Sequence, residues 1–132
     1  MIAVRNFEEK GLQLAINFVV YGRPNIKKFK QTQKGWHNTV FFIHEDDETI
    51  LQWISRKKAY SDSRVYLKEV TNISDVPNQN ILKKVKSKNL LVLTIGESRF
   101  LALDFEDPQS KQQWWQGIQH FWTLSKKPQK HE

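Results

Sequence analysis

Positive charge is concentrated in one segment near the start of the chain. Residues 23–37, RPNIKKFKQTQKGWH, contain five basic side chains and no acidic one: Arg23, Lys27, Lys28, Lys30 and Lys34. Lysine ammonium groups bind phosphate as point charges. Strand-like sequence lies on both sides, so the segment predicts a hairpin tip that attracts an anionic ligand. The alternative is a solvated basic loop that binds nothing.

Two further features extend this candidate site. A second basic patch, Arg56, Lys57 and Lys58, directly follows the predicted strand at residues 49–55. Trp36 and His37 lie beside the first patch, and indole side chains favour the membrane interface. Trp36 therefore either inserts its apolar ring into the membrane interface beside the tip or packs at the end of the fold.

The overall charge limits the partners that the chain can prefer. The formal net charge is +7 over 132 residues, which favours lipid headgroups, nucleic acid or an acidic protein. Nucleic acid is disfavoured because the aromatic residues fall mostly at positions predicted to be buried, which leaves no stacking platform. The lysine run at residues 83–88 is expected to be a solvated strand edge.

Catalytic chemistry finds little support in the sequence. There is no cysteine, which removes disulfides, thiolate zinc sites and cysteine nucleophiles. His37, His44, His120 and His131 do not have metal-ligand spacing. The glycines are isolated, so no phosphate-cradling loop is predicted. We expect no enzymatic activity, no metal and no cofactor.

The chain length suits a single domain over residues 1–132. No apolar run approaches the roughly 18 residues that span a bilayer. The acidic residues near the start argue against a signal peptide, and Ile2 does not fit a myristoylation signal. We therefore expect a cytoplasmic protein that reaches membranes only peripherally.

The site must be positioned by short strands between two helices. Apolar spacing predicts an N-terminal helix at residues 6–21. Barrel strands follow within residues 26–105, at 26–30, 36–44, 49–55, 65–70, 81–88, 90–95 and 99–105. Asp107 and Pro108 then open a helix at residues 107–124, with Asp as cap, and residues 125–132 form a tail. In the first strand, Ile26 and Lys28 are expected on one face, with Lys27 and Phe29 on the other.

Most connections are too short for crossover helices, so the strands must be antiparallel. The last helix carries an apolar face of Trp114, Trp115, Ile118, Phe121 and Trp122. A small barrel with this helix over one end would cover both the sheet edges and the helix face. The predicted class is mainly β: a seven-stranded antiparallel barrel capped by a C-terminal α-helix, with a short N-terminal helix.

The order of these elements resembles a pleckstrin homology (PH) domain, most like the type found in phosphoinositide-specific phospholipase C, which has a short helix before its first strand. Four segments carry the resemblance: LQLAINFVVYG at 12–22, FFIHEDDETILQWISRK at 41–57, VYLKEVTNI at 65–73 and FLALDFEDPQSKQQWWQGI at 100–118. The last contains the tryptophan that is typical of the family's final helix, here Trp114.

The resemblance implies a lipid-binding site at the open end of the barrel. Strong phosphoinositide binders of the family place basic residues on the first strand, on the second strand and after the third. The first and third positions match Lys27, Lys28 and Lys30, and Arg56, Lys57 and Lys58. No arginine occupies the second strand, where Val40 lies near the expected place. This departure implies modest selectivity among anionic lipids, including phosphatidic acid.

The sequence thus predicts a non-catalytic signalling module that recruits a cytosolic protein to membranes. It would bind anionic phospholipid headgroups, either phosphoinositide or phosphatidic acid. The lipid-binding residues are expected to be Lys27, Lys28, Lys30, Lys34, Trp36, His37, Arg56, Lys57 and Lys58. The alternative is a scaffold of the same fold that binds a protein partner and no specific lipid.

Overall fold

The computed structural model describes residues 2–20, 23–30, 35–54, 63–76, 82, 88–97 and 99–127. For residues 2–9, 23–25, 30, 35 and 37 it describes the backbone only. The strands are β1 (Arg23–Lys30), β2 (Gly35–Ile43), β3 (Ile50–Trp53), β4 (Arg64–Tyr66), β5 (Val70–Ser74), β6 (Leu90–Ile95) and β7 (Arg99–Asp104). The helices are α1 (Ile2–Val20), the 3-10 turn η2 (Leu67–Glu69) and α2 (Pro108–Lys126).

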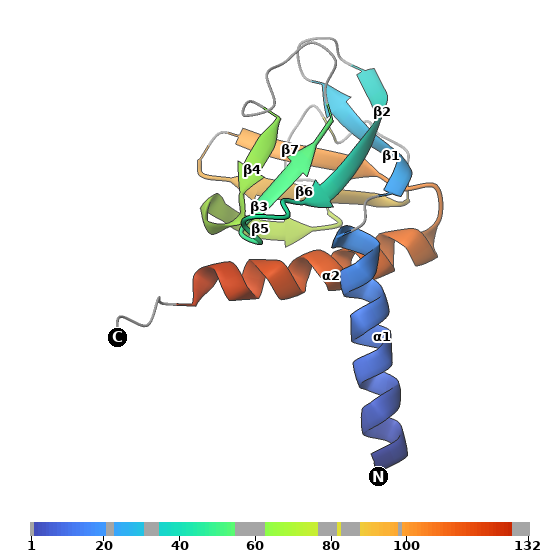
Figure 1. Cartoon of the computed structure of the whole chain (residues 1–132). Helices are drawn as coiled ribbons and strands as arrows, with labels where there is room; N and C mark the ends of the chain where they lie inside the picture. Colours follow the sequence, from blue (N-terminus) through green and yellow to red (C-terminus); the bar gives the residue numbers. More distant parts are fainter. Residues whose placement is uncertain are drawn as a thin grey trace, which may run out of the picture.

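The strands form one seven-stranded sheet in the order β4-β3-β2-β1-β7-β6-β5, and every neighbouring pair is antiparallel. The pairing of β1 with β7 joins the two halves of the sheet. Its edge strands, β4 and β5, are consecutive in the chain and are connected by η2. Figure 1 shows the sheet curled over α2, which confirms the predicted antiparallel barrel with a C-terminal helix.

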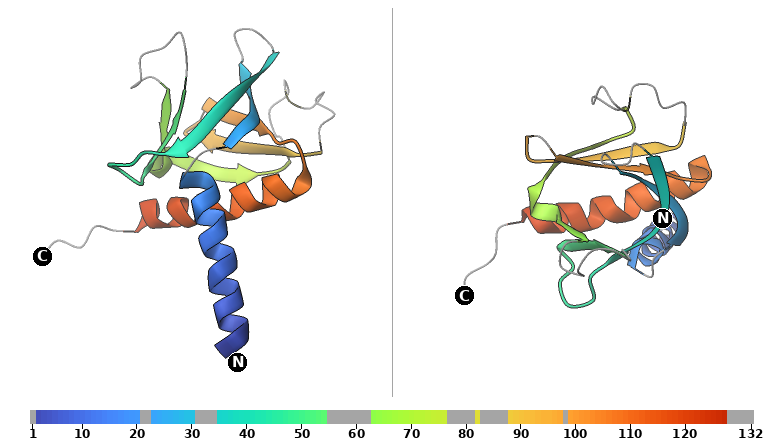
Figure 2. Two further views of the ribbon diagram at one scale, coloured as in Figure 1. Left: turned by 45° about the vertical axis from the view of Figure 1, so that its right-hand side comes forward. Right: turned by 90° about the horizontal axis from the view of Figure 1, so that it is seen from above.

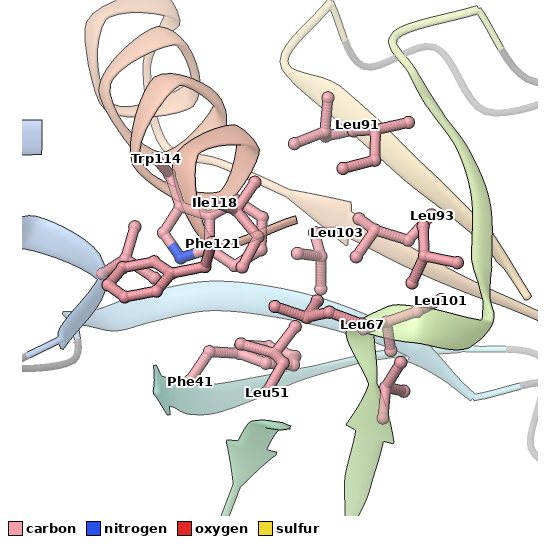
Figure 3. Packing of buried hydrophobic residues seen from close by; sticks show 14 of the residues in the cluster. Phe41, Leu51, Leu67, Leu91, Leu93, Leu101, Leu103, Trp114, Ile118 and Phe121 are labelled. Atoms are coloured by element: carbon pink, nitrogen blue, oxygen red, sulfur yellow. The ribbon is translucent and has the colours of Figure 1, made fainter. Parts of the chain in front are cut away.

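Helix α2 begins where the sequence predicts. The Asp107 carboxylate accepts a hydrogen bond from the Ser110 backbone N–H at 2.6 Å, and Pro108 occupies the first turn. Trp114, Ile118 and Phe121 are buried and point from α2 toward Phe41, Leu51 and the leucines of β6 and β7, as Figure 3 shows. The helix therefore closes one end of the barrel with its apolar face.

Helix α1 has 19 residues and is longer than predicted. Its C-terminal half contacts α2, whereas its N-terminal half extends away from the barrel in both views (Figures 1 and 2). Ala15 and Val19 are buried at the contact, while residues 10–14 are exposed. Among the described side chains of α1, the buried ones therefore lie in its second half.

The fifth strand differs from the prediction. It lies at Val70–Ser74, whereas the prediction placed it at residues 81–88. Within that range only Leu82 and Lys88 are described, and neither is part of a strand; the rest of the predicted strand lies outside the described residues. The alternating stretch at residues 65–70 is divided by η2, which turns the chain from one sheet edge to the other. Val70 and Ile73 then face the core. No glycine or proline marks this turn, which is why the sequence did not reveal it.

Candidate functional site

Strand β1 carries basic residues on both of its faces. Ile26 is buried in the main core, Lys27 is exposed, and Lys28 and Phe29 are half-buried. Phe29 packs with a separate cluster on the other face of the sheet. The predicted assignment is therefore confirmed: Ile26 and Lys28 face the core side, whereas Lys27 and Phe29 face outward.

Four strand ends meet at the end of the barrel away from α2. There β1 ends and β2 begins, and β3 ends and β4 begins, as the views in Figures 1 and 2 agree. Lys28 lies two positions before the end of β1, and Trp53 is the last residue of β3. Strand β1, which carries part of the first predicted basic patch, and strand β3, which precedes the second in the chain, thus finish at the same end of the fold.

On the core side, Lys28 contacts an aromatic ring. Its Nζ lies 5.1 Å from the centroid of the Trp53 ring, within the range of a cation–π interaction. Trp53 is only 5% exposed, and its ring packs 5.7 Å from that of Phe41. The Lys28 ammonium therefore lies over the rim of the hydrophobic core.

The base of the β3–β4 connection holds Trp53 in place. The Trp53 backbone N–H donates to the Ser63 carbonyl at 2.9 Å. The fully buried Gln52 side chain donates to the same carbonyl at 2.7 Å and to the Trp53 carbonyl at 3.3 Å. This bonding fixes the backbone at the end of β3. Neither Trp53 nor Gln52 was predicted as a site residue.

Lys27 has a different environment on the outward face. In the strand register it lies opposite Asn38 of β2 and Asp104 of β7. Opposite charges in facing positions of a sheet attract each other, so Asp104 reduces the local positive potential at Lys27. Lys28, one residue further on, faces His37 and Leu103.

Trp36 lies on the outward face, beside Phe29. Their ring centroids are 5.3 Å apart, and both pack against a small second cluster formed by Leu82, Leu90, Val92 and Ala102. Trp36 remains half-exposed. The contact of Phe29 with Trp36 was not predicted from the sequence, because it depends on the register of β1 and β2.

Several predicted site residues cannot be compared with the structure. Lys34, Arg56, Lys57 and Lys58 lie outside the described residues, and so do the side chains of Lys30 and His37. Backbone register places Lys30 opposite Gly35, next to the β1–β2 connection. The convergence of all nine side chains on one ligand remains a prediction.

The acidic segment at residues 45–48 forms the β2–β3 turn, as predicted. The Asp47 carboxylate accepts hydrogen bonds from the Thr49 hydroxyl at 2.6 Å and from the Thr49 N–H at 2.9 Å. These bonds lower the pKa of Asp47 below its usual value. Within the described part of the chain, no group of His, Asp and Glu side chains is arranged to hold a metal ion. No helix there has the length and apolar character of a membrane span.

Comparison with solved structures identifies the class of fold. The structure is similar to Inner Membrane Complex Sub-compartment Protein 3 from Toxoplasma gondii, with 10% identity, a TM-score of 0.64, and 90% of this chain and 88% of that chain covered. It is also similar to the C-terminal PH domain of human pleckstrin, with 18% identity, a TM-score of 0.57, and 80% and 93% covered. A third similar structure is the N-terminal PH domain of human ARAP2, with 12% identity, a TM-score of 0.52, and 84% of this chain and 86% of that chain covered.

The chain therefore has the PH fold. A comparison with protein-family profiles finds no match, and a comparison with curated proteins finds none. The identities are low, so the likeness concerns the fold. The resemblance to the phospholipase C type remains a prediction from the sequence.

Proposed function

We propose that this protein is a non-catalytic module that brings a cytosolic protein to anionic membranes. It would bind phosphoinositide or phosphatidic acid headgroups through the end of the barrel away from α2. The observation that carries this proposal is the position of Lys28, on the core side of β1 at the end where β3 also finishes. The predicted basic residues of both neighbouring connections would add to the same surface.

The strength of such binding follows from the number of charges. A basic residue near an anionic membrane contributes about 1 kcal/mol. The five basic residues of 23–37 could then supply about 5 kcal/mol, a dissociation constant between millimolar and micromolar. Charge alone thus supports only weak, salt-sensitive attachment, and firm recruitment requires a second interaction. The half-exposed Trp36 and Phe29 offer that apolar contact on the outward face.

Selectivity among headgroups is expected to be modest. Strand β2 provides no arginine, and Val40 is half-buried near the place where strong binders carry a base. A planar guanidinium binds phosphate oxygens in a bidentate manner, which a lysine ammonium does not. We therefore expect phosphatidic acid and several phosphoinositides to bind with similar affinity.

A protein-interaction scaffold is the second candidate function. Leu14 of α1 is 61% exposed although it lies in the half of the helix that contacts α2, and the N-terminal half of α1 extends away from the barrel (Figure 2). An exposed apolar side chain on a projecting helix suits a protein contact. In that case the positive charge would orient the domain without a specific lipid.

Charge reversal tests the lipid proposal against this scaffold. The double variant Lys28→Glu, Lys30→Glu should lose most of its pelleting with vesicles that contain phosphatidic acid. The matched control Lys83→Glu, Lys84→Glu makes the same change in charge in another segment. It should pellet with these vesicles more than the Lys28→Glu, Lys30→Glu variant does. Equal losses would indicate diffuse attraction, and unchanged pelleting of both variants would reject the proposed site. If the unmodified protein does not pellet with any anionic vesicle, the scaffold is the better account.

A further inference from the structure

We propose that Trp53 is a positioning residue for phosphate recognition, because its ring holds the ammonium group of Lys28 on the core side of the open end. A single phosphate group would then bind at Lys28, inside the rim of the barrel, and not at the adjacent Lys27. The inference rests on the proposed function and specifies where within that site the phosphate binds.

The first step is the rigidity of the Trp53 ring. The ring is almost fully buried and packs against Phe41, whose own ring lies 6.4 Å from that of Trp114 in the core. The backbone of Trp53 is held by Ser63 and by the Gln52 side chain. Trp53 is thus a fixed surface at the end of β3, unlike a side chain on a solvated loop.

The second step is the effect of this surface on Lys28. A lysine side chain has many rotamers, and holding its ammonium in one place has an entropic cost. The negative face of the indole attracts the ammonium and restricts it before any ligand arrives. Part of the ordering cost is then already met in the free protein, which strengthens binding. An ammonium has three rotatable donors, so contact with a ring is compatible with donation to phosphate oxygen.

The third step is the contrast between the two neighbouring lysines. Lys27 points outward and lies opposite Asp104 in the register. Lys28 points to the core side, and its cross-strand neighbours are His37 and Leu103. An anion approaching Lys27 would meet the field of the Asp104 carboxylate. Binding at Lys27 is therefore disfavoured, whereas the ammonium group of Lys28 is positioned by the Trp53 ring.

The ligand chemistry is a phosphate ester, which could come from a lipid headgroup or from a soluble molecule. Soluble inositol trisphosphate and vesicles containing phosphatidic acid distinguish the two sources. Binding of both would place the phosphate group at the centre of recognition. Binding of vesicles alone would indicate that the membrane interface is also required.

The test is a double-mutant cycle with binding as the readout. Trp53→Leu should weaken phosphate binding about twofold to fivefold, and Trp53→Phe should weaken it less because an aromatic face remains. In a Lys28→Met background, Trp53→Leu should have no further effect on binding, although its effect on stability should persist. Lys27→Met removes the same charge from the neighbouring position and should weaken vesicle binding less than Lys28→Met does, since Asp104 lies opposite Lys27 in the register.

Fluorescence gives a readout that a purely structural role would not change. Ligand binding at Lys28 should alter the tryptophan emission of the unmodified protein, and the alteration should be largely absent in Trp53→Phe. The proposal is overturned if Trp53→Leu weakens binding equally with and without Lys28, or if Lys27→Met weakens it more than Lys28→Met. Salt-sensitive vesicle binding by the unmodified protein would still support the proposed function in those cases, whereas no vesicle binding would reject both.

Discussion

Gly117 of α2 lies directly against the backbone of Ala15 in α1. A Cβ atom at position 117 would collide with the Ala15 carbonyl oxygen and would lie 2.5 Å from Cγ2 of Val19. The two helices therefore approach each other at a distance that only glycine permits. Through this contact, the second half of α1 packs against α2, the helix that closes the barrel.

We predict that Gly117→Leu separates α1 from α2. Forcing a side chain into a packed contact costs about 1–3 kcal/mol, and the melting temperature should fall accordingly. The matched control is Gly11→Ala, because a Cβ there has no neighbour within 4 Å. Alanine should stabilise that helical position by about 0.5–1 kcal/mol. A Gly117→Leu variant as stable as the unmodified protein would show that α1 does not pack in this way.

Truncation of the central tryptophan should be among the most damaging single changes. Trp114 is fully buried, with the Phe105 ring 5.6 Å and the Phe41 ring 6.4 Å away. Trp114→Ala should reduce the free energy of unfolding by about 3–5 kcal/mol, since it leaves a large cavity. Chemical denaturation measures this loss, and an unchanged midpoint would mean that the residue is not part of the core.

The sequence predicted those parts of the fold that depend on local chemistry. Asp107 and Pro108 correctly placed the start of α2, and the residues 45–48 turn was recognised from its polar run. The strand at Val70–Ser74 was not predicted, because the turn at η2 depends on Leu67, which is buried by tertiary packing and has no turn signature. Propensity alone does not report such a contact.

For the candidate site, the sequence predicted the pattern along one strand but not the contacts between strands. Alternation along β1 correctly separated Lys27 from Lys28. The contact of Lys28 with Trp53 was not predictable, since it joins β1 and β3, which are separated in the sheet by β2. The Phe29–Trp36 pair likewise required the register of β1 against β2. Contacts across strands depend on register, which short strands with bulges specify weakly.

The two half-buried tryptophans of α2 should differ in their contribution to stability. The Trp122 indole N–H donates to the Val70 carbonyl at 3.0 Å, whereas Trp115 donates to no described residue. Trp122→Phe removes that hydrogen bond and should cost about 0.5–1.5 kcal/mol more than Trp115→Phe. Urea denaturation of both variants measures the difference. Equal losses would show that the bond between α2 and β5 does not contribute.

Asp47 should make the β2–β3 turn sensitive to acid. Its pKa is lowered in the folded state from the ordinary value of 3.8, chiefly by hydrogen bonds from the Thr49 hydroxyl and N–H. The ionised form therefore stabilises the fold above that value, and this contribution is lost as the pH falls through the lower folded pKa. Asp47→Asn should reduce stability at neutral pH. Below about pH 4, the melting temperature of this variant should fall less with decreasing pH than that of the unmodified protein. An unchanged acid profile would contradict the role of these bonds.

The most direct test of membrane recruitment is flotation of the unmodified protein with vesicles at two salt concentrations. The vesicles would contain neutral lipid alone, or neutral lipid with phosphatidic acid, phosphatidylserine or a phosphoinositide. We predict association with every anionic vesicle at low salt, modest differences among headgroups and none with neutral lipid. Raising the salt should release the protein, because exposed charges are screened beyond about 10 Å at 0.1 M ionic strength. Failure to float with any anionic vesicle at low salt would contradict the account.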